Sequence, residues 1–139
     1  MSGTGPANQT PPTGKKLHIV IVDDLLQMRD IVKQSLGREG HAVESFRDGE
    51  SALAYIKKNL EAVDLFISDH HMPKMNGLEV VHELRKTPYQ GRVFIFSSEI
   101  DHDVNDAYLE LKVDTVLPKP IILPELKQLL AEFWPPAKA

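Results

Sequence analysis

The sequence contains no cysteine, no long hydrophobic run and no excess of positive charge. Without cysteine the chain forms no disulfide, no thiolate metal site and no cysteine nucleophile, and we expect a reducing, cytoplasmic location. No apolar run approaches the length of a membrane-spanning helix, so no membrane partner is expected. The formal net charge is −4, whereas phosphate recognition usually requires a basic surplus. The sequence therefore predicts no direct contact with nucleic acid.

The chain is long enough for one domain with a hydrophobic core. It has 139 residues, and the 42% that are hydrophobic are an ordinary share for a globular protein. Residues 1–14 carry no charged side chain and are dense in Gly, Pro, Ser, Thr and Asn, which predicts a disordered N-terminal tail. We expect the folded domain to span residues 15–134. Residues 135–139 begin with two prolines and are interpreted as a C-terminal tail or the start of a linker.

Short apolar runs alternate with amphipathic stretches along the rest of the chain. Five runs predict β-strands: Leu17–Val22, His41–Phe46, Val63–Ser68, Arg92–Phe96 and Thr115–Leu117. The stretches between them have apolar residues at helical spacing. Strands that alternate with helices need crossover connections. The sequence therefore predicts an α/β fold, with a doubly wound parallel sheet of five strands and five helices on its two faces.

Polar residues end four of these runs. The set comprises Asp23 and Asp24, Asp69, Ser97 with Ser98, and Lys119. Ligands in such folds bind beyond the carboxyl ends of the strands, so we expect these side chains to meet at one edge of the sheet. Clustered carboxylates repel one another unless a cation lies among them, and oxygen-only ligands favour Mg²⁺. A carboxylate beside that cation is a nucleophile toward phosphorus, and an ammonium and a hydroxyl stabilise phosphoryl oxygens.

Each of these residues, taken alone, has a simpler explanation. A single Asp or Ser at a strand end is usually a turn or cap residue. Asp24 is placed to cap a helix that begins near Leu25. Lys119 alone would be a surface lysine. The combination at the ends of four different strands is what indicates a site.

These segments resemble the receiver domain of two-component response regulators, from about Leu17 to Phe133. The resemblance lies in IVIVDD (19–24), DLFISDHHMPKMNGLEV (64–80), VFIFSS (93–98) and VLPKP (116–120). It implies a flavodoxin-like fold with strand order 2-1-3-4-5 and a cis peptide bond before Pro120. Two interpretations are open. The chain is either a single-domain, chemotaxis-type receiver or a receiver cut from a longer protein with an output domain.

The resemblance also implies a role for individual residues. Asp69 would accept a phosphoryl group. Mg²⁺ would be held by the carboxylates of Asp23, Asp24 and Asp69 and by the backbone carbonyl of His71. Lys119 would contact the phosphoryl group.

Three further positions follow from the same resemblance. Ser97 takes the place of the switch hydroxyl. His71 and Glu99 would flank the water that attacks the phosphoryl group, and would set the rate of dephosphorylation. Many receivers have an inward-turning aromatic residue at the position of Val116, so the signal here would need a different repacking, for which Tyr108 is a nearby candidate.

The implied function is signalling rather than catalysis on a separate substrate. A sensor histidine kinase or a histidine phosphotransfer protein would supply the phosphoryl group, and the domain would catalyse only its own phosphorylation and dephosphorylation. The signal would leave through a face formed by the helix of Val104–Leu111, the strand Thr115–Leu117 and the helix of Leu126–Phe133. A downstream protein or an output domain would bind there.

Two other functions fit parts of the sequence. Asp69-His70-His71 opens like the metal motif of Asp-His-His phosphoesterases, but such enzymes need further Asp and His ligands and a larger frame. The second alternative is a pseudo-receiver that works only as an interaction module, although none of the chemical positions is missing. No role is predicted for His70.

Overall fold

The computed structural model describes residues 13–98 and 101–136 of the chain. In these residues one parallel sheet has the order β2-β1-β3-β4-β5. Its strands are β1 (His18–Val22), β2 (Ala42–Phe46), β3 (Leu65–Asp69), β4 (Arg92–Ser97) and β5 (Thr115–Pro118). The helices between and after them are α1 (Leu26–Arg38), α2 (Gly49–Lys57), α3 (Gly77–Leu84), α4 (His102–Glu110) and α5 (Leu123–Phe133). The predicted fold class and strand order are confirmed.

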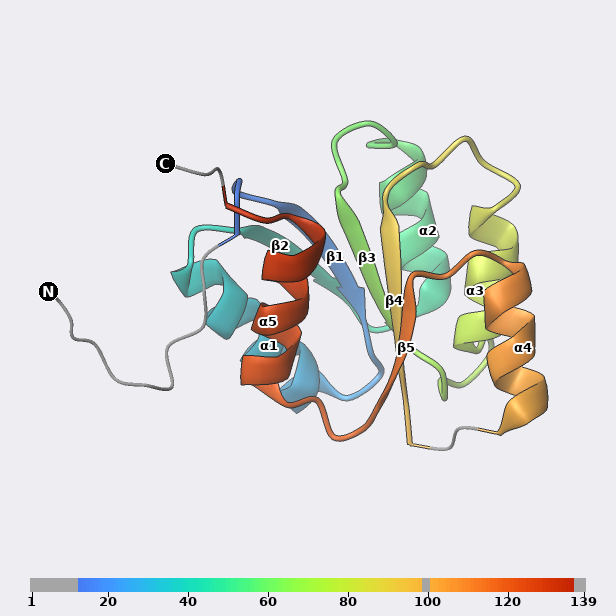
Figure 1. Cartoon of the computed structure of the whole chain (residues 1–139). Helices are drawn as coiled ribbons and strands as arrows, with labels where there is room; N and C mark the ends of the chain where they lie inside the picture. The colour runs from blue at the N-terminus through green and yellow to red at the C-terminus, as the bar shows by residue number, and fades with distance from the viewer. Residues whose placement is uncertain (1–12, 99–100, 137–139) are drawn as a thin grey trace, which may run out of the picture.

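The helices form two layers, one on each face of the sheet (Figure 1). Helices α1 and α5 cover one face, and α2, α3 and α4 cover the other. Strand β1 shows why its sequence is apolar from Ile19 to Val22. Ile19 and Ile21 pack toward α1 and α5, whereas Val20 and Val22 pack toward the other layer. All four are at most 1% exposed. Burying each such side chain contributes about 1.5–3 kcal/mol, so strands covered on both faces need apolar residues at every position.

The two ends of the described chain lie side by side. The Gly14 N–H donates a hydrogen bond to the carbonyl of Trp134 at 2.7 Å. The rest of the predicted N-terminal tail, residues 1–12, lies outside the described residues, as do residues 137–139 of the predicted C-terminal tail. The Lys119–Pro120 peptide bond is cis, as the resemblance implies. Among the described helices, none combines the length and apolar character needed to cross a membrane.

Candidate functional site

The acidic pair lies where β1 ends, next to the carboxyl ends of β2 and β3. Asp23 is 2% exposed, and its Oδ1 accepts a hydrogen bond from the Leu25 N–H at 2.9 Å. Asp24 is exposed. Helix α1 begins without a side-chain cap, so the alternative interpretation of Asp24 as a helix cap is wrong. Asp23 instead holds the first turn of the loop, which leaves Asp24 at the surface of the site.

Asp69 is the last residue of β3 and is 5% exposed. Its Oδ2 lies 3.0 Å from Lys119 Nζ, and its Oδ1 accepts a hydrogen bond from the His71 N–H at 3.4 Å. Burial raises the pKa of this carboxyl. The Asp23 carboxylate adds to the rise, and the Lys119 ammonium only partly offsets it. Asp69 is therefore a buried carboxylate that lacks enough positive charge around it.

Lys119 connects the two buried carboxylates. Its ammonium lies 3.1 Å from Asp23 Oδ2 and 3.0 Å from Asp69 Oδ2. The backbone N–H of Lys119 donates a hydrogen bond to the Ser97 carbonyl at 2.9 Å, which connects the segment after β5 to the end of β4. Burial alone would lower the pKa of the ammonium, but the hydrogen bonds to Asp69 and Asp23 outweigh it and the pKa is raised. Lys119 therefore stays charged and points into the site.

The three carboxylates converge as their positions at strand ends predict. Ligand oxygens from Asp23, Asp24 and Asp69 all lie within 4.8 Å of one another. One ammonium serves this set, so the cluster retains negative charge. Oxygen donors in this arrangement fit a hard divalent cation. Among the described residues, this grouping of Asp, Glu and His side chains is the one close enough to hold a metal, and it contains no histidine.

Ser97, His71 and Glu99 complete the set of predicted site residues. Ser97 ends β4 and is 1% exposed. Its strand pairs with β3, and the residue before it, Phe96, is opposite Asp69. His71 is exposed in the loop after β3. Glu99 lies outside the described residues, so its predicted position beside the site stays a prediction.

A buried pair that the sequence does not predict lies next to Asp69. His70 Nδ1 is 2.6 Å from the hydroxyl of Tyr108, and the two rings meet edge to face with centroids 5.5 Å apart. Tyr108 is fully buried and His70 is 8% exposed. Burial raises the pKa of the Tyr108 phenol, and the nearby Asp69 charge adds to the rise. No spacing rule links two residues so far apart in the chain.

The loop between β3 and α3 holds this pair in place. The Gly77 N–H donates to the His70 carbonyl at 2.8 Å, and Asn76 and Glu79 form a capping box that fixes the start of α3. A side chain at Gly77 would meet the Tyr108 hydroxyl at 2.5 Å and the Asp69 carbonyl at 2.8 Å. The glycine is therefore required for the close approach of α3, α4 and the end of β3.

Comparisons with known proteins find similar chains. A family model described as the response regulator receiver domain matches residues 19–131. The transcriptional regulatory protein CpxR of Klebsiella pneumoniae is 39% identical over 105 residues, which are 73% of this chain and 42% of that protein. Response regulator MprA of a Mycobacterium species is 34% identical over 110 residues, 79% of this chain and 47% of that protein. This chain thus spans less than half of either relative.

A solved structure has a similar fold. The chemotaxis protein CheY4 of Vibrio cholerae superposes with a TM-score of 0.74 at 28% sequence identity. The match covers 86% of this chain and 97% of that chain. The similarity therefore extends over nearly the whole of that protein.

Proposed function

The chain belongs to the response regulator receiver domain family, and from this premise we propose that Asp69 accepts a phosphoryl group from a histidine kinase or a histidine phosphotransfer protein. The observation that carries the proposal is the contact of the Lys119 ammonium with both buried carboxylates, Asp69 and Asp23. That arrangement puts a nucleophile and a positive charge at the same edge of the sheet. It supports transfer to the protein itself rather than turnover of a separate substrate.

The transfer is a simple displacement at phosphorus. A carboxylate oxygen of Asp69 forms the new O–P bond, and the P–N bond to the donor histidine breaks, with the electron pair left on the imidazole nitrogen. Lys119 would meet the transferred phosphoryl oxygens, and the Ser97 hydroxyl would donate to them after transfer. The signal would end by hydrolysis: water attacks phosphorus, the O–P bond to Asp69 breaks, and inorganic phosphate leaves.

The cation proposed for the carboxylate cluster is Mg²⁺. Asp23, Asp24 and Asp69 would hold it together with the backbone carbonyl of His71, since hard oxygen donors are the ligands it prefers. When bound, it would offset the negative charge of the carboxylates and of the incoming phosphoryl oxygens. The raised pKa of Asp69 supports this assignment, because it reflects a carboxylate that Lys119 alone does not neutralise.

The phosphorylated domain would signal through the face of α4, β5 and α5. A downstream protein, or an output domain in a longer chain, would bind to that face.

One curated relative over this region is the sensor histidine kinase AruS of Pseudomonas aeruginosa, 31% identical over 133 residues but with only 13% of that protein matched. We place the domain in the cytoplasm, where such kinases present their phosphohistidine.

The direct test uses the purified chain, Mg²⁺ and acetyl phosphate. We expect the intact mass of the parent to increase by one phosphoryl group, and chelation of the metal to prevent the increase. Asp69→Asn should gain no mass. Asp30→Asn, which changes an exposed carboxyl on α1, is the matched control and should label like the parent. Labelling of Asp69→Asn at the parent's rate would refute the proposal.

Two neighbouring residues would set the lifetime of the phosphorylated state. His71 is exposed beside Asp69, and its backbone already contacts the Asp69 carboxylate. Glu99 is proposed from the resemblance alone. Exchange of either residue for alanine should change the rate of phosphate loss without preventing phosphorylation. The decay of the phosphorylated mass over time measures this, and identical decay in both variants and the parent would contradict it.

A further inference from the structure

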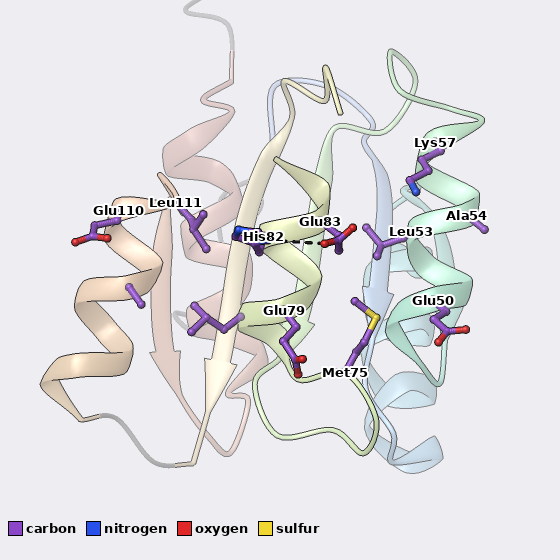
Figure 2. A pocket seen from close by; sticks show the side chains of 12 residues that line it. Glu50, Leu53, Ala54, Lys57, Met75, Glu79, His82, Glu83, Glu110 and Leu111 are labelled. Carbon is purple, nitrogen blue, oxygen red and sulfur yellow. Dashed lines mark ion pairs between the residues drawn. The ribbon is translucent and has the colours of Figure 1, made fainter. Parts of the chain in front are cut away.

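A groove crosses the outer surface of α2, α3 and α4, on the sheet face opposite α1 and α5. Figure 2 shows α3 between the other two helices, with Leu111 on one side of it and Leu53 on the other. Its volume is about 990 Å³. The apolar lining comes from Leu53, Ala54, Met75, Leu78, Ala107 and Leu111.

The lining of the groove also carries acidic side chains. Four carboxylates and one ammonium line it, which gives a formal charge of −3 with His82 neutral; the carboxylates are Glu50, Glu79, Glu83 and Glu110, and the ammonium is Lys57. They come from all three helices (Figure 2). Glu79 and Glu83 lie on the central helix α3, between Leu53 and Leu111 (Figure 2), and Glu83 also pairs with Lys86 at 2.8 Å. The groove therefore combines apolar side chains with negative charge on all three helices.

We propose that this groove docks a basic amphipathic helix of a partner protein. Such a helix would place one apolar stripe against Leu78 and Leu111, beside α4. Its Lys and Arg side chains would lie toward Glu79 and Glu83 of α3 on one flank and toward Glu110 of α4 on the other. The flexible Met75 side chain at the end of the groove suits an adaptable contact. Residues 1–12 of this chain contain neither Lys nor Arg, so they lack the charge this site requires.

The groove is also connected to Asp69 through Tyr108. This tyrosine follows Ala107, and it is the buried residue of α4. Its hydroxyl contacts His70, the neighbour of Asp69, at 2.6 Å. A displacement of His70 on phosphorylation would therefore move the α4 wall of the groove. This second step rests on the proposed function, whereas docking to the unmodified chain does not. By thermodynamic linkage, docking of the helix and phosphorylation of Asp69 would then each change the free energy of the other.

The docking test uses a labelled helical peptide of about 16 residues with a leucine stripe and lysines on both flanks. Fluorescence anisotropy of its binding to the full chain gives the affinity. Ala107→Arg puts a long cationic side chain into the α4 wall of the groove, and should weaken binding about tenfold or more. Ser51→Arg makes the same charge change at an exposed position of α2 outside the groove, and should change affinity less than about threefold.

Several outcomes would overturn the docking proposal. They are equal losses in the two variants, equally tight binding of a peptide with glutamates in place of the lysines, and no saturable binding to the parent. Self-association of the parent that Ala107→Arg abolishes would show by sedimentation that a second copy, not a partner helix, occupies the groove. That result would also refute the proposal.

The coupling is tested with the same peptide, with and without Mg²⁺ and acetyl phosphate. Phosphorylation should change the affinity of the parent at least about fivefold. Tyr108→Phe should still gain the phosphoryl mass but lose this change. Tyr89→Phe, which removes another buried hydroxyl, should keep it. Equal affinities before and after phosphorylation of the parent would refute the coupling alone. Absence of the mass gain would refute the proposed function and the coupling, while peptide binding to the unmodified chain still decides the docking.

Discussion

At the scale of single residues, the site is defined by a shortage of positive charge. Asp23 and Asp69 are both at most 5% exposed, and burial of unpaired charges is costly. Lys119 contacts both, yet the pKa of Asp69 is still raised, because its burial outweighs the contact with the shared ammonium and the Asp23 carboxylate adds to the rise. The structure thus retains an electrostatic cost at the residue proposed to react, as expected where a bound cation would supply the missing positive charge.

A glycine keeps the space behind this site open. The β-carbon of Gly77→Ala would approach the Asp69 carbonyl to 2.8 Å and the Tyr108 hydroxyl to 2.5 Å, so the backbone would have to shift. We expect a loss of about 1–3 kcal/mol in the free energy of unfolding and slower phosphorylation of Asp69. Gly37→Ala is the matched control, because nothing lies within 4 Å of its new carbon inside α1.

The control should move in the opposite direction. Alanine in a helix interior is favoured over glycine, so Gly37→Ala should stabilise the chain by roughly 0.5–1 kcal/mol. Urea denaturation measures both variants. If Gly77→Ala were as stable as the parent, with an unchanged phosphorylation rate, the close approach described for α3 would be wrong.

At the scale of secondary-structure elements, a buried histidine joins the beginnings of β1 and β2. His41 is 5% exposed, and its Nδ1 accepts a hydrogen bond from the Leu17 N–H at 2.9 Å. Burial lowers the pKa of His41 below its ordinary value of 6.5. The unfolded chain therefore binds a proton that the folded chain excludes. The contribution to stability is present above pH 6.5 and falls as the pH decreases below it, by at most about 1.4 kcal/mol per pH unit.

An asparagine separates the hydrogen bond from the titration. His41→Asn keeps an acceptor oxygen near the position of Nδ1, so its stability should depend less on pH between about 7.5 and 5.5 than that of the parent. His82→Asn replaces an exposed histidine on α3 and should keep the parent's pH dependence. Urea denaturation at several pH values gives these slopes. If stability depended on pH equally in His41→Asn and the parent, the conclusion that His41 is neutral and accepts the hydrogen bond would be wrong.

Among the described residues, helix α4 contacts the core through the buried Tyr108 and the partly buried Val104. Tyr108 is its buried residue among those described, and its hydroxyl bonds to His70. Tyr108→Phe should cost about 1 kcal/mol of stability and increase hydrogen exchange throughout α4. Tyr89→Phe removes a hydroxyl that bonds to the Arg92 carbonyl, and should cost no more while leaving exchange in α4 unchanged. Increased α4 exchange in both variants would show that the His70 contact has no special role.

At the scale of the whole molecule, the layers and the site follow from the sequence for identifiable reasons. Burial on both faces makes the strands continuous apolar runs, and each predicted strand is within two residues of its observed bounds. Parallel strands place all their carboxyl ends at one edge. For this reason Asp23, Asp69 and Lys119 could be predicted to meet before any coordinates were known. The strand order, by contrast, was available only from the resemblance to receivers.

Other features depend on packing that no periodicity records. The contact of His70 with Tyr108 joins residues 38 positions apart, and it exists because α4 packs beside α3 at the end of β3. Asp24 has the sequence features of a helix cap, but Asp23 takes the local hydrogen bond to Leu25 instead. The groove over α3 likewise depends on the relative placement of three helices. Sequence patterns describe the face that each helix buries, and they carry little information about the outer surface.

The central claim is that Asp69 itself carries the phosphoryl group, and locating the modification tests it most directly. The chain would be incubated with Mg²⁺ and acetyl phosphate and treated with borohydride, which reduces an acyl phosphate to the alcohol. Peptide mass spectrometry would then locate the altered residue. The account predicts a single altered residue, Asp69, and none when the metal is chelated. Modification of His70 or His71, or of an aspartate other than Asp69, would contradict it.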